Sequence, residues 1–102
     1  GADVNVRGER DEYLRRLGEV AHLFTDAGLI FITTVSYLDE YELEMIEKLN
    51  EPYDCLLINI GENRFSKGRA DLEIEAQADT TKAIQEISSL LARKNYVMEY
   101  YL

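Results

Sequence analysis

The sequence predicts an α/β fold, a three-layer sandwich in which helices flank a mostly parallel sheet. Segments with apolar residues at helical spacing alternate along the chain with short apolar runs. Two of those runs are almost continuously apolar, as in parallel strands that are covered on both faces. We therefore expect the order helix, strand, helix, strand, strand, helix, within a single domain over residues 1–102.

The first helix is expected to begin near residues 9–11, after an irregular segment over residues 1–8, and to end at residues 26–28. Its apolar positions follow helical spacing, at Leu14, Leu17, Ala21 and Phe24. Gly28 stands where a left-handed C-cap belongs. The β-branched and large apolar run over residues 29–35 follows at once and predicts the first strand.

The remaining elements are expected at residues 39–49 (helix), 54–60 (strand), 70–76 (strand) and about 80–94 (helix). Ser36 or Asp39 would cap the first of these helices, and Asp79 or Thr80 the last. Strand 70–76 alternates apolar and acidic residues, which is typical of a half-exposed strand near a sheet edge. The side chains expected to face inward from the two helices are Leu43, Ile46, Leu49, Ile84, Ile87 and Leu91. The aromatic tail over residues 96–102 has no assigned place.

Composition and charge exclude several functions. The net charge of −9 repels phosphate backbones, so we expect no nucleic acid partner. No apolar run approaches the roughly 20 residues that a membrane span needs, and the polar N-terminus is unlike a signal peptide. Cys55 is the single cysteine and lies in a predicted strand, as a buried, reduced thiol would. These features predict a cytoplasmic protein that binds neither membranes nor nucleic acid.

One stretch, residues 14–33, carries a motif: an arginine pair followed in order by Glu19-Val20-Ala21, Leu23-Phe24 and Asp26-Ala27-Gly28. It resembles the IRR-x-x-EVA-x-LF-x-DAG-LI segment of the adenylylsulfate kinase family. Residues 70–76 and 80–91 look like the family's final strand and final helix. The resemblance implies a P-loop kinase-like (Rossmann-like) domain, of which this chain would be the C-terminal portion. It also implies ATP-dependent 3′-phosphorylation of adenylylsulfate, with ATP and Mg²⁺ expected only for the complete parent domain.

The resemblance also implies substrate-binding residues. Asp3 lies in a segment similar to the end of the family's DGDNVR motif and would lie near metal and ribose. Arg7 and Arg10 would hold the anionic groups of the substrate. Ser36 is singled out from its position instead: it lies at the carboxyl end of the first predicted strand, where doubly wound folds bind ligands, and would face a nucleotide. No catalytic residue and no metal ligand is assigned.

Each of these residues also has a structural alternative. The arginines near the start, including Arg15 and Arg16, would be solvated helix charges paired with acidic neighbours. Asp3 would lie in a frayed terminus, and Ser36 would cap the next helix. His22, the single histidine, is expected to be a boundary residue of an amphipathic helix rather than to take part in catalysis. Two further residues, Tyr37 and Tyr41, are expected to serve packing rather than base stacking.

The sequence departs from the family in ways that bear on activity. It contains no Gly-Lys pair and therefore no Gly-x-x-x-x-Gly-Lys-[Ser/Thr] loop to hold phosphates. Tyr13 replaces an asparagine, and residues 35–39 replace the family's ISP segment. The family's long lid is reduced to residues 61–69. The resemblance implies that Arg64, Phe65, Lys67 and Arg69 are remnants of that lid.

These departures predict that the isolated chain is not an active kinase. The alternative function is a degenerate, non-catalytic docking or regulatory module. As partners we expect adenylylsulfate and ATP by resemblance. A homo-oligomer, or a fusion to a GTP-binding sulfate adenylyltransferase subunit, is also compatible with the sequence.

Overall fold

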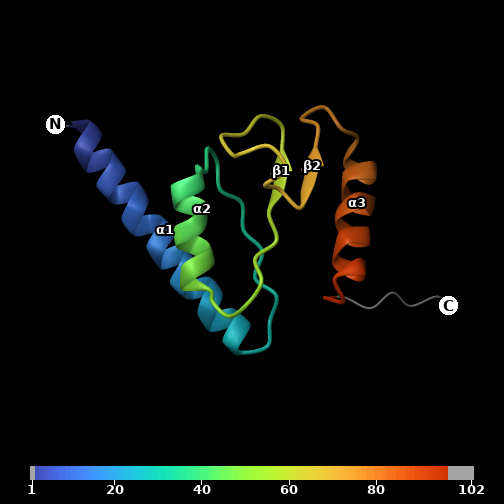
Figure 1. Cartoon of the computed structure of the whole chain (residues 1–102), viewed down its shortest axis with the longest axis horizontal. Helices are drawn as coiled ribbons and strands as arrows, with labels where there is room; N and C mark the ends of the chain where they lie inside the picture. Colours follow the sequence, from blue (N-terminus) through green and yellow to red (C-terminus); the bar gives the residue numbers. More distant parts are fainter. Residues whose placement is uncertain (1, 97–102) are drawn as a thin grey trace. The chain divides into compact units, whose positions relative to one another are not determined.

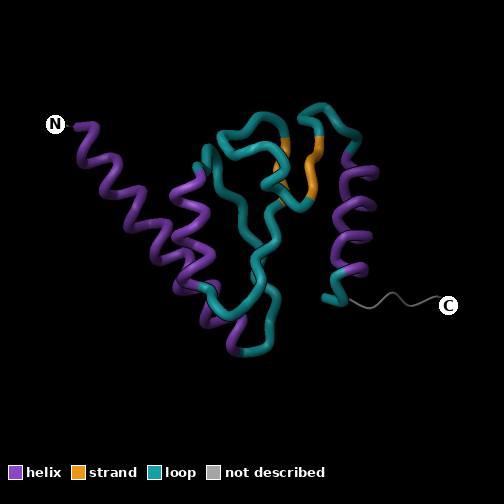
Figure 2. Tube along the Cα trace, viewed as in Figure 1, coloured by secondary structure: helices purple, strands orange, loops and turns teal. Residues whose placement is uncertain are grey.

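The computed structural model describes residues 2–96 and, within them, side chains from residue 7 onward. This part of the chain contains three helices and a two-stranded parallel sheet (Figures 1 and 2). In chain order they are α1 (Ala2–Asp26), α2 (Glu40–Leu49), β1 (Ile58–Ile60), β2 (Leu72–Ile74) and α3 (Thr80–Arg93). The α/β class and the parallel pairing are confirmed, while a full three-layer sandwich is not seen among these residues.

The chain forms two compact units. One holds α1 and α2 together with residues 64–66, and the other holds β1, β2 and α3. Within the first unit α1 packs against α2, and within the second α3 packs against β2. No helix of the described residues is long and apolar enough to cross a membrane. The aromatic tail from residue 97 lies outside the described residues.

Helix α1 begins earlier than expected, because residues 2–8 are helical rather than irregular. Gly8 weakens a helix without ending it, and adding a turn to an existing helix costs far less than nucleating one. The C-terminal end is as expected. Gly28 has φ +83°, its N–H donates to the Thr25 carbonyl at 2.9 Å, and the Leu29 N–H donates to the Phe24 carbonyl at 3.0 Å. These two bonds form a Schellman motif, which ends α1 where the glycine allows it.

The prediction of a strand over residues 29–35 is wrong, because this segment is a loop (Figure 2). Leu29, Ile30 and Ile32 are exposed, Ile32 to 79%. A strand exists only when a neighbouring strand accepts its backbone hydrogen bonds, and no strand of the described residues pairs with this segment. Residues 29–35 therefore have the apolar composition of a buried strand but do not form one.

The packing of α1 on α2 forms the core of the first unit. Leu14 is fully buried and Leu43 nearly so. Gly18 permits close approach, because a Cβ added there would lie 2.8 Å from Cδ1 of Leu49. Asn50, the C-cap of α2, is buried and donates from Nδ2 to the Gly18 carbonyl at 3.3 Å and to the Ile46 carbonyl at 2.8 Å. These contacts fix how the two helices meet.

The second unit is built on the parallel pair, in which Ile58 pairs with Leu72 and Ile60 with Ile74. Both strands are shorter than the predicted 54–60 and 70–76, since a ladder extends only as far as both partners stay side by side. The predicted alternation is present in β2, where Glu73 is exposed and Ile74 is buried. Helix α3 has the expected N-cap, Asp79. Its buried residue is Leu90, whereas Ile84, expected to face inward, is exposed.

The two glycines inside α1 make a matched test of the helix packing. Gly8→Ala adds a methyl group to open space and should stabilise the chain by about 0.5–1 kcal/mol through helix propensity. Gly18→Ala should fail to give this gain, because its methyl group collides with Leu49. Chemical unfolding of both variants measures the difference; an equal gain at both positions would contradict the packing described.

The exposed apolar side chains of this loop, Leu29, Ile30 and Ile32, should promote association between chains, as large apolar patches do. Ile32→Thr should therefore reduce self-association while leaving the unfolding midpoint nearly unchanged. Analytical ultracentrifugation and thermal unfolding measure the two effects. Ile74→Thr, at a buried position, is the control and should lower the midpoint clearly. A large loss of stability from Ile32→Thr would show that this side chain is covered.

Candidate functional site

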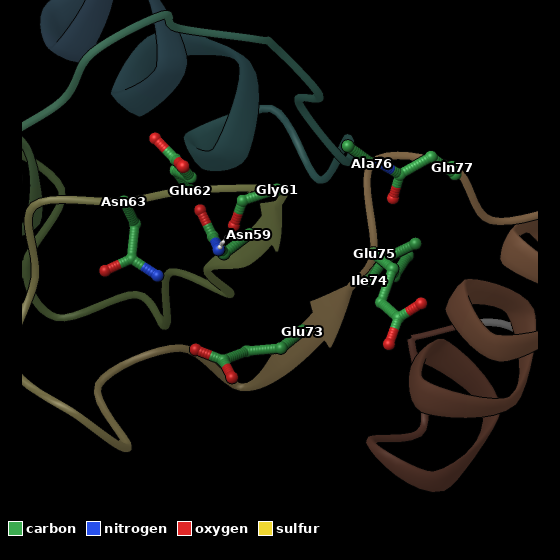
Figure 3. A pocket seen from close by; sticks show the side chains of 9 residues that line it. All are labelled: Asn59, Gly61, Glu62, Asn63, Glu73, Ile74, Glu75, Ala76 and Gln77. Atoms are coloured by element: carbon green, nitrogen blue, oxygen red, sulfur yellow. Dashed lines mark hydrogen bonds between the residues drawn. The ribbon is translucent and has the colours of Figure 1, made fainter.

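A pocket of about 680 Å³ lies at the carboxyl ends of β1 and β2 (Figure 3), where α/β folds commonly bind ligands. It is lined by Asn59, Gly61, Glu62, Asn63, Glu73, Ile74, Glu75, Ala76 and Gln77. Gly61 begins the loop after β1 with φ +82°, and its N–H donates to the Ile74 carbonyl at 2.9 Å. A Cβ there would lie 3.4 Å from that of Ala76, so the backbone turns closely at this edge.

The charge of this pocket does not suit an anionic ligand. Its ionisable lining residues are three glutamates and no basic residue: Glu62, Glu73 and Glu75. Asn59 donates from Nδ2 to the Gly61 carbonyl at 2.8 Å, which commits its amide to the loop. Among the described residues no three His, Cys, Asp or Glu side chains are grouped so as to hold a metal ion. The pocket is therefore an acidic depression rather than a cradle for phosphate.

A second cluster, in the first unit, surrounds Arg10 and includes two of the predicted site residues. The Arg10 guanidinium donates to both carboxylate oxygens of Glu42, from Nε at 2.6 Å and from Nη2 at 3.1 Å. Nη2 also donates to the carbonyls of Ser36 at 2.9 Å and of Tyr37 at 3.3 Å. Arg10 and Ser36 thus lie together, but through the backbone of Ser36 and not its hydroxyl. We call Arg10, Glu42 and the Ser36–Tyr37 turn the Arg10 cluster.

The Arg10 cluster is tied to the start of α2. Asp39, the N-cap, accepts from the Glu42 N–H at 2.8 Å, and Glu42 accepts from the Asp39 N–H at 3.1 Å. This reciprocal pair is a capping box. Its sequence signature, an Asp followed three residues later by Glu, was present in the chain and would have identified Glu42. The hydrogen bonds from Arg10 lower the pKa of the Glu42 carboxyl, and the same bonds raise the pKa of Arg10.

The Ser36–Tyr37 turn projects an aromatic ring outward. Tyr37 has φ +59°, and its side chain is exposed, as is that of Tyr41. The expectation that these two tyrosines serve packing is therefore wrong. Arg64, in the loop after β1, lies with its guanidinium carbon 5.6 Å from the centre of the Tyr37 ring, which is cation–π geometry. Nothing in the local sequence around Arg64 signals this contact.

The other residues singled out from the sequence have simpler surroundings. Arg7 is exposed on α1, and Asp3 lies in the same helix, where its side chain is not among those described. Arg15 pairs with Asp11 at 3.2 Å and Arg16 pairs with Glu12 at 2.6 Å. Both are exposed pairs four residues apart, as the alternative of solvated helix charges predicts. Substrate binding by Asp3, Arg7, Arg10 and Ser36 remains a prediction.

A small network near the end of α1 was missed from the sequence. Tyr53 donates its hydroxyl proton to Asp26, which raises the pKa of the Tyr53 phenol. His22 Nε2 lies 3.4 Å from the other carboxylate oxygen of Asp26, and the His22 ring meets Tyr53 edge-on at 5.4 Å. The network joins the loop after α2 to α1, which agrees with the boundary position expected for His22.

Comparison with known proteins gives a partial match. Over 87 residues the chain is 38% identical to an adenylyl-sulfate kinase from Prochlorococcus marinus. The chain resembles part of an adenylyl-sulfate kinase. The match covers 79% of this chain and 42% of the kinase, so the chain spans less than half the length of that relative. No protein-family model and no solved structure matches the chain.

The match confirms the resemblance that the sequence motif indicated. It is a match of sequence over part of an enzyme. Activity, substrates, cofactors and partners of this chain are therefore matters for proposal.

Removing the Arg10 guanidinium tests whether the Arg10 cluster stabilises the fold. Arg10→Ala should lower the free energy of unfolding by about 1–2 kcal/mol, because it leaves the mostly buried Glu42 carboxylate and two carbonyls without this donor. Arg15→Ala breaks an exposed helical pair and should change it by about 0.5 kcal/mol or less. Equal effects of the two variants in urea unfolding would refute a structural role for Arg10.

The same ion pair predicts a pH dependence. Since the folded protein lowers the pKa of Glu42, its contribution is complete above the ordinary glutamate pKa of about 4.3 and is lost as the pH falls below it. The stability advantage of the wild type over Glu42→Gln should therefore shrink as the pH falls from about 5 to 3. Unfolding measured at a series of pH values reports this; a constant difference would rule out the lowered pKa.

Proposed function

We propose that this chain is part of an adenylyl-sulfate kinase-type domain, its C-terminal portion, which transfers the γ-phosphoryl group of ATP to the 3′-hydroxyl of adenylylsulfate. The observation that supports this proposal is the 38% identity over 87 residues to an adenylyl-sulfate kinase. The arginine pair, the Asp26-Ala27-Gly28 end of α1 and the parallel strands are compatible with it.

The chain alone is proposed to be inactive. Phosphoryl transfer requires backbone N–H groups and a lysine around the phosphates. No Gly-Lys pair occurs in the sequence. Mg²⁺ in kinases is held by one or two side chains and by the phosphates, and the described residues supply no cluster that would complete such a site. These parts would have to come from the portion of the kinase that this chain does not match.

Within this proposal, Asp3, Arg7, Arg10 and Ser36 belong to the substrate-binding side of the complete domain. The Arg10 guanidinium already makes four hydrogen bonds within the chain. Its role would then be to position the Ser36–Tyr37 turn, while Arg7, which is exposed, has its guanidinium at the surface. Arg7 is therefore the better candidate for direct contact with an anionic group.

The alternative is a non-catalytic docking or regulatory module, within a protein that includes a GTP-binding sulfate adenylyltransferase subunit or as a homo-oligomer. Two observations favour it. The loop over residues 61–69 is short compared with the family's lid, and the pocket at the strand ends is acidic. A cytoplasmic location is compatible with both functions and remains a prediction.

The deciding experiment assays formation of 3′-phosphoadenylylsulfate from ATP and adenylylsulfate. The 102-residue chain should form none, and the longest natural protein that contains it should form product. Within that longer protein, Arg7→Ala should lower kcat/KM at least tenfold, whereas Arg15→Ala, in an exposed helical pair, should leave it nearly unchanged. Product from the isolated chain would overturn its proposed inactivity. A longer protein without activity, and without nucleotide binding, would favour the docking module.

A further inference from the structure

The loop after α1 carries a segment that is suited to a strand but has no strand partner (Figure 2). The backbone N–H and C=O groups of residues 30–35 form no hydrogen bond with any described residue. Residues 29–35 contain no charged residue, proline or glycine and are rich in β-branched side chains. A segment of this composition pairs readily with the edge of a sheet when one is within reach.

This segment is held at both ends and in the middle. The Schellman motif of α1 fixes its start, and Arg10 fixes its end through the carbonyls of the Ser36–Tyr37 turn. Between them the Phe31 ring stacks on the Phe24 ring, with centroids 5.7 Å apart and ring planes at 25°. Ile32 is nevertheless 79% exposed. A segment fixed in this way loses little conformational freedom when another strand pairs with its open side.

Strand β1 offers a complementary edge. The sheet has two strands among the described residues, so one side of β1 has no neighbouring strand there. The Gly61 N–H donates to the Ile74 carbonyl at 2.9 Å, so Gly61 faces β2. Because the backbone groups of successive residues in a strand point to opposite sides, those of Ile58 and Ile60 face the open side. The side chain of Ile60 is 61% exposed, so nothing covers it in the described part of the chain.

The charge distribution decides which surfaces of two copies of this chain can meet. The net charge of −9 makes two copies repel each other. The two longest stretches without a charged side chain are residues 27–38 and 55–61, which contain the unpaired segment and β1. The residues in and beside β2 are acidic instead, at Asp71, Glu73 and Glu75. The open edge of β1 is therefore the edge of the sheet that a second copy can approach with little repulsion.

We propose that residues 30–34 of one chain add as a strand to the open edge of β1 in a second copy, and that the exchange is reciprocal. The closed dimer then carries two such contacts. Each contact extends a two-stranded sheet to three strands, whereas pairing residues 29–35 of two copies with each other would give an isolated two-stranded pair, which is marginally stable. This inference goes beyond the proposed function and does not depend on it.

The test compares three lysine variants of the 102-residue chain by analytical ultracentrifugation. Ile32→Lys and Ile60→Lys each place a charge on one half of the contact and should raise the dissociation constant of the dimer about tenfold or more. Ile84→Lys makes the same charge change at an isoleucine of α3 that is equally exposed, at 58%, and should leave the constant nearly unchanged. All three positions are exposed, so the midpoints of thermal unfolding should stay close to that of the wild type.

Two further measurements identify the surfaces that meet. Mixing the Ile32→Lys and Ile60→Lys chains should restore association, because their heterodimer keeps one unaltered contact. In the wild type, the amides of Ile58 and Ile60 and alternate amides of residues 30–34 should exchange hydrogen more slowly as the chain concentration rises. The Gly61 amide is the internal control, because it is already bonded to Ile74 and its exchange should not change.

Three results would overturn the proposal. The first is a wild-type chain that stays monomeric at the concentrations used for NMR. The second is association that Ile32→Lys abolishes and Ile60→Lys does not, or that mixing the two variants fails to restore, since residues 29–35 would then meet another surface. The third is protection of both sets of amides in a monomer of the longest natural protein that contains the chain, because a strand of that protein would then occupy these edges in place of a second copy.

Discussion

The first unit depends on the hydrogen bonds that the Arg10 guanidinium makes with Glu42 and with the Ser36–Tyr37 turn. Arg10 lies on α1 and Glu42 lies 32 residues later on α2, so these bonds join parts of the chain that no local preference brings together. Glu42 also completes the capping box of α2. One carboxylate therefore fixes the start of a helix and the place of that helix against α1, with only 13% of its side chain exposed.

The starts of α2 and α3 and the end of α1 were predictable, because they are encoded locally. Asp39 and Asp79 cap the helices that follow them, and Gly28 ends α1 through its positive φ, all as the residue types indicate. The strands were not predictable to the same degree, since a strand requires a partner elsewhere in the chain. Residues 29–35 have the apolar composition of a buried strand, but they form a loop. Composition alone does not provide the neighbouring strand that their backbone would have to pair with.

The candidate site, like the fold, could be predicted from the sequence only in part. Arg10 was singled out from a family resemblance and Ser36 from its place after a predicted strand, and the structure brings the two residues together. The partner that matters most, Glu42, was missed in spite of a visible capping signature, because a cap does not reveal which distant cation it will meet. The stacking of Arg64 on Tyr37 has no sequence signal at all, since it depends on how the loop after β1 lies against the turn.

The charges around the carboxyl ends of β1 and β2 decide whether an anion can bind there. Strand ends in α/β folds hold phosphates when a helix N-terminus or basic side chains supply donors. Here the pocket at the ends of β1 and β2 presents Glu62, Glu73 and Glu75, and the side chain of the N-cap Asp79 accepts from an N–H at the start of α3. Because phosphate and sulfate groups need donors that no carboxylate balances, the three glutamates and the capped start of α3 make this pocket unsuited to an anionic ligand.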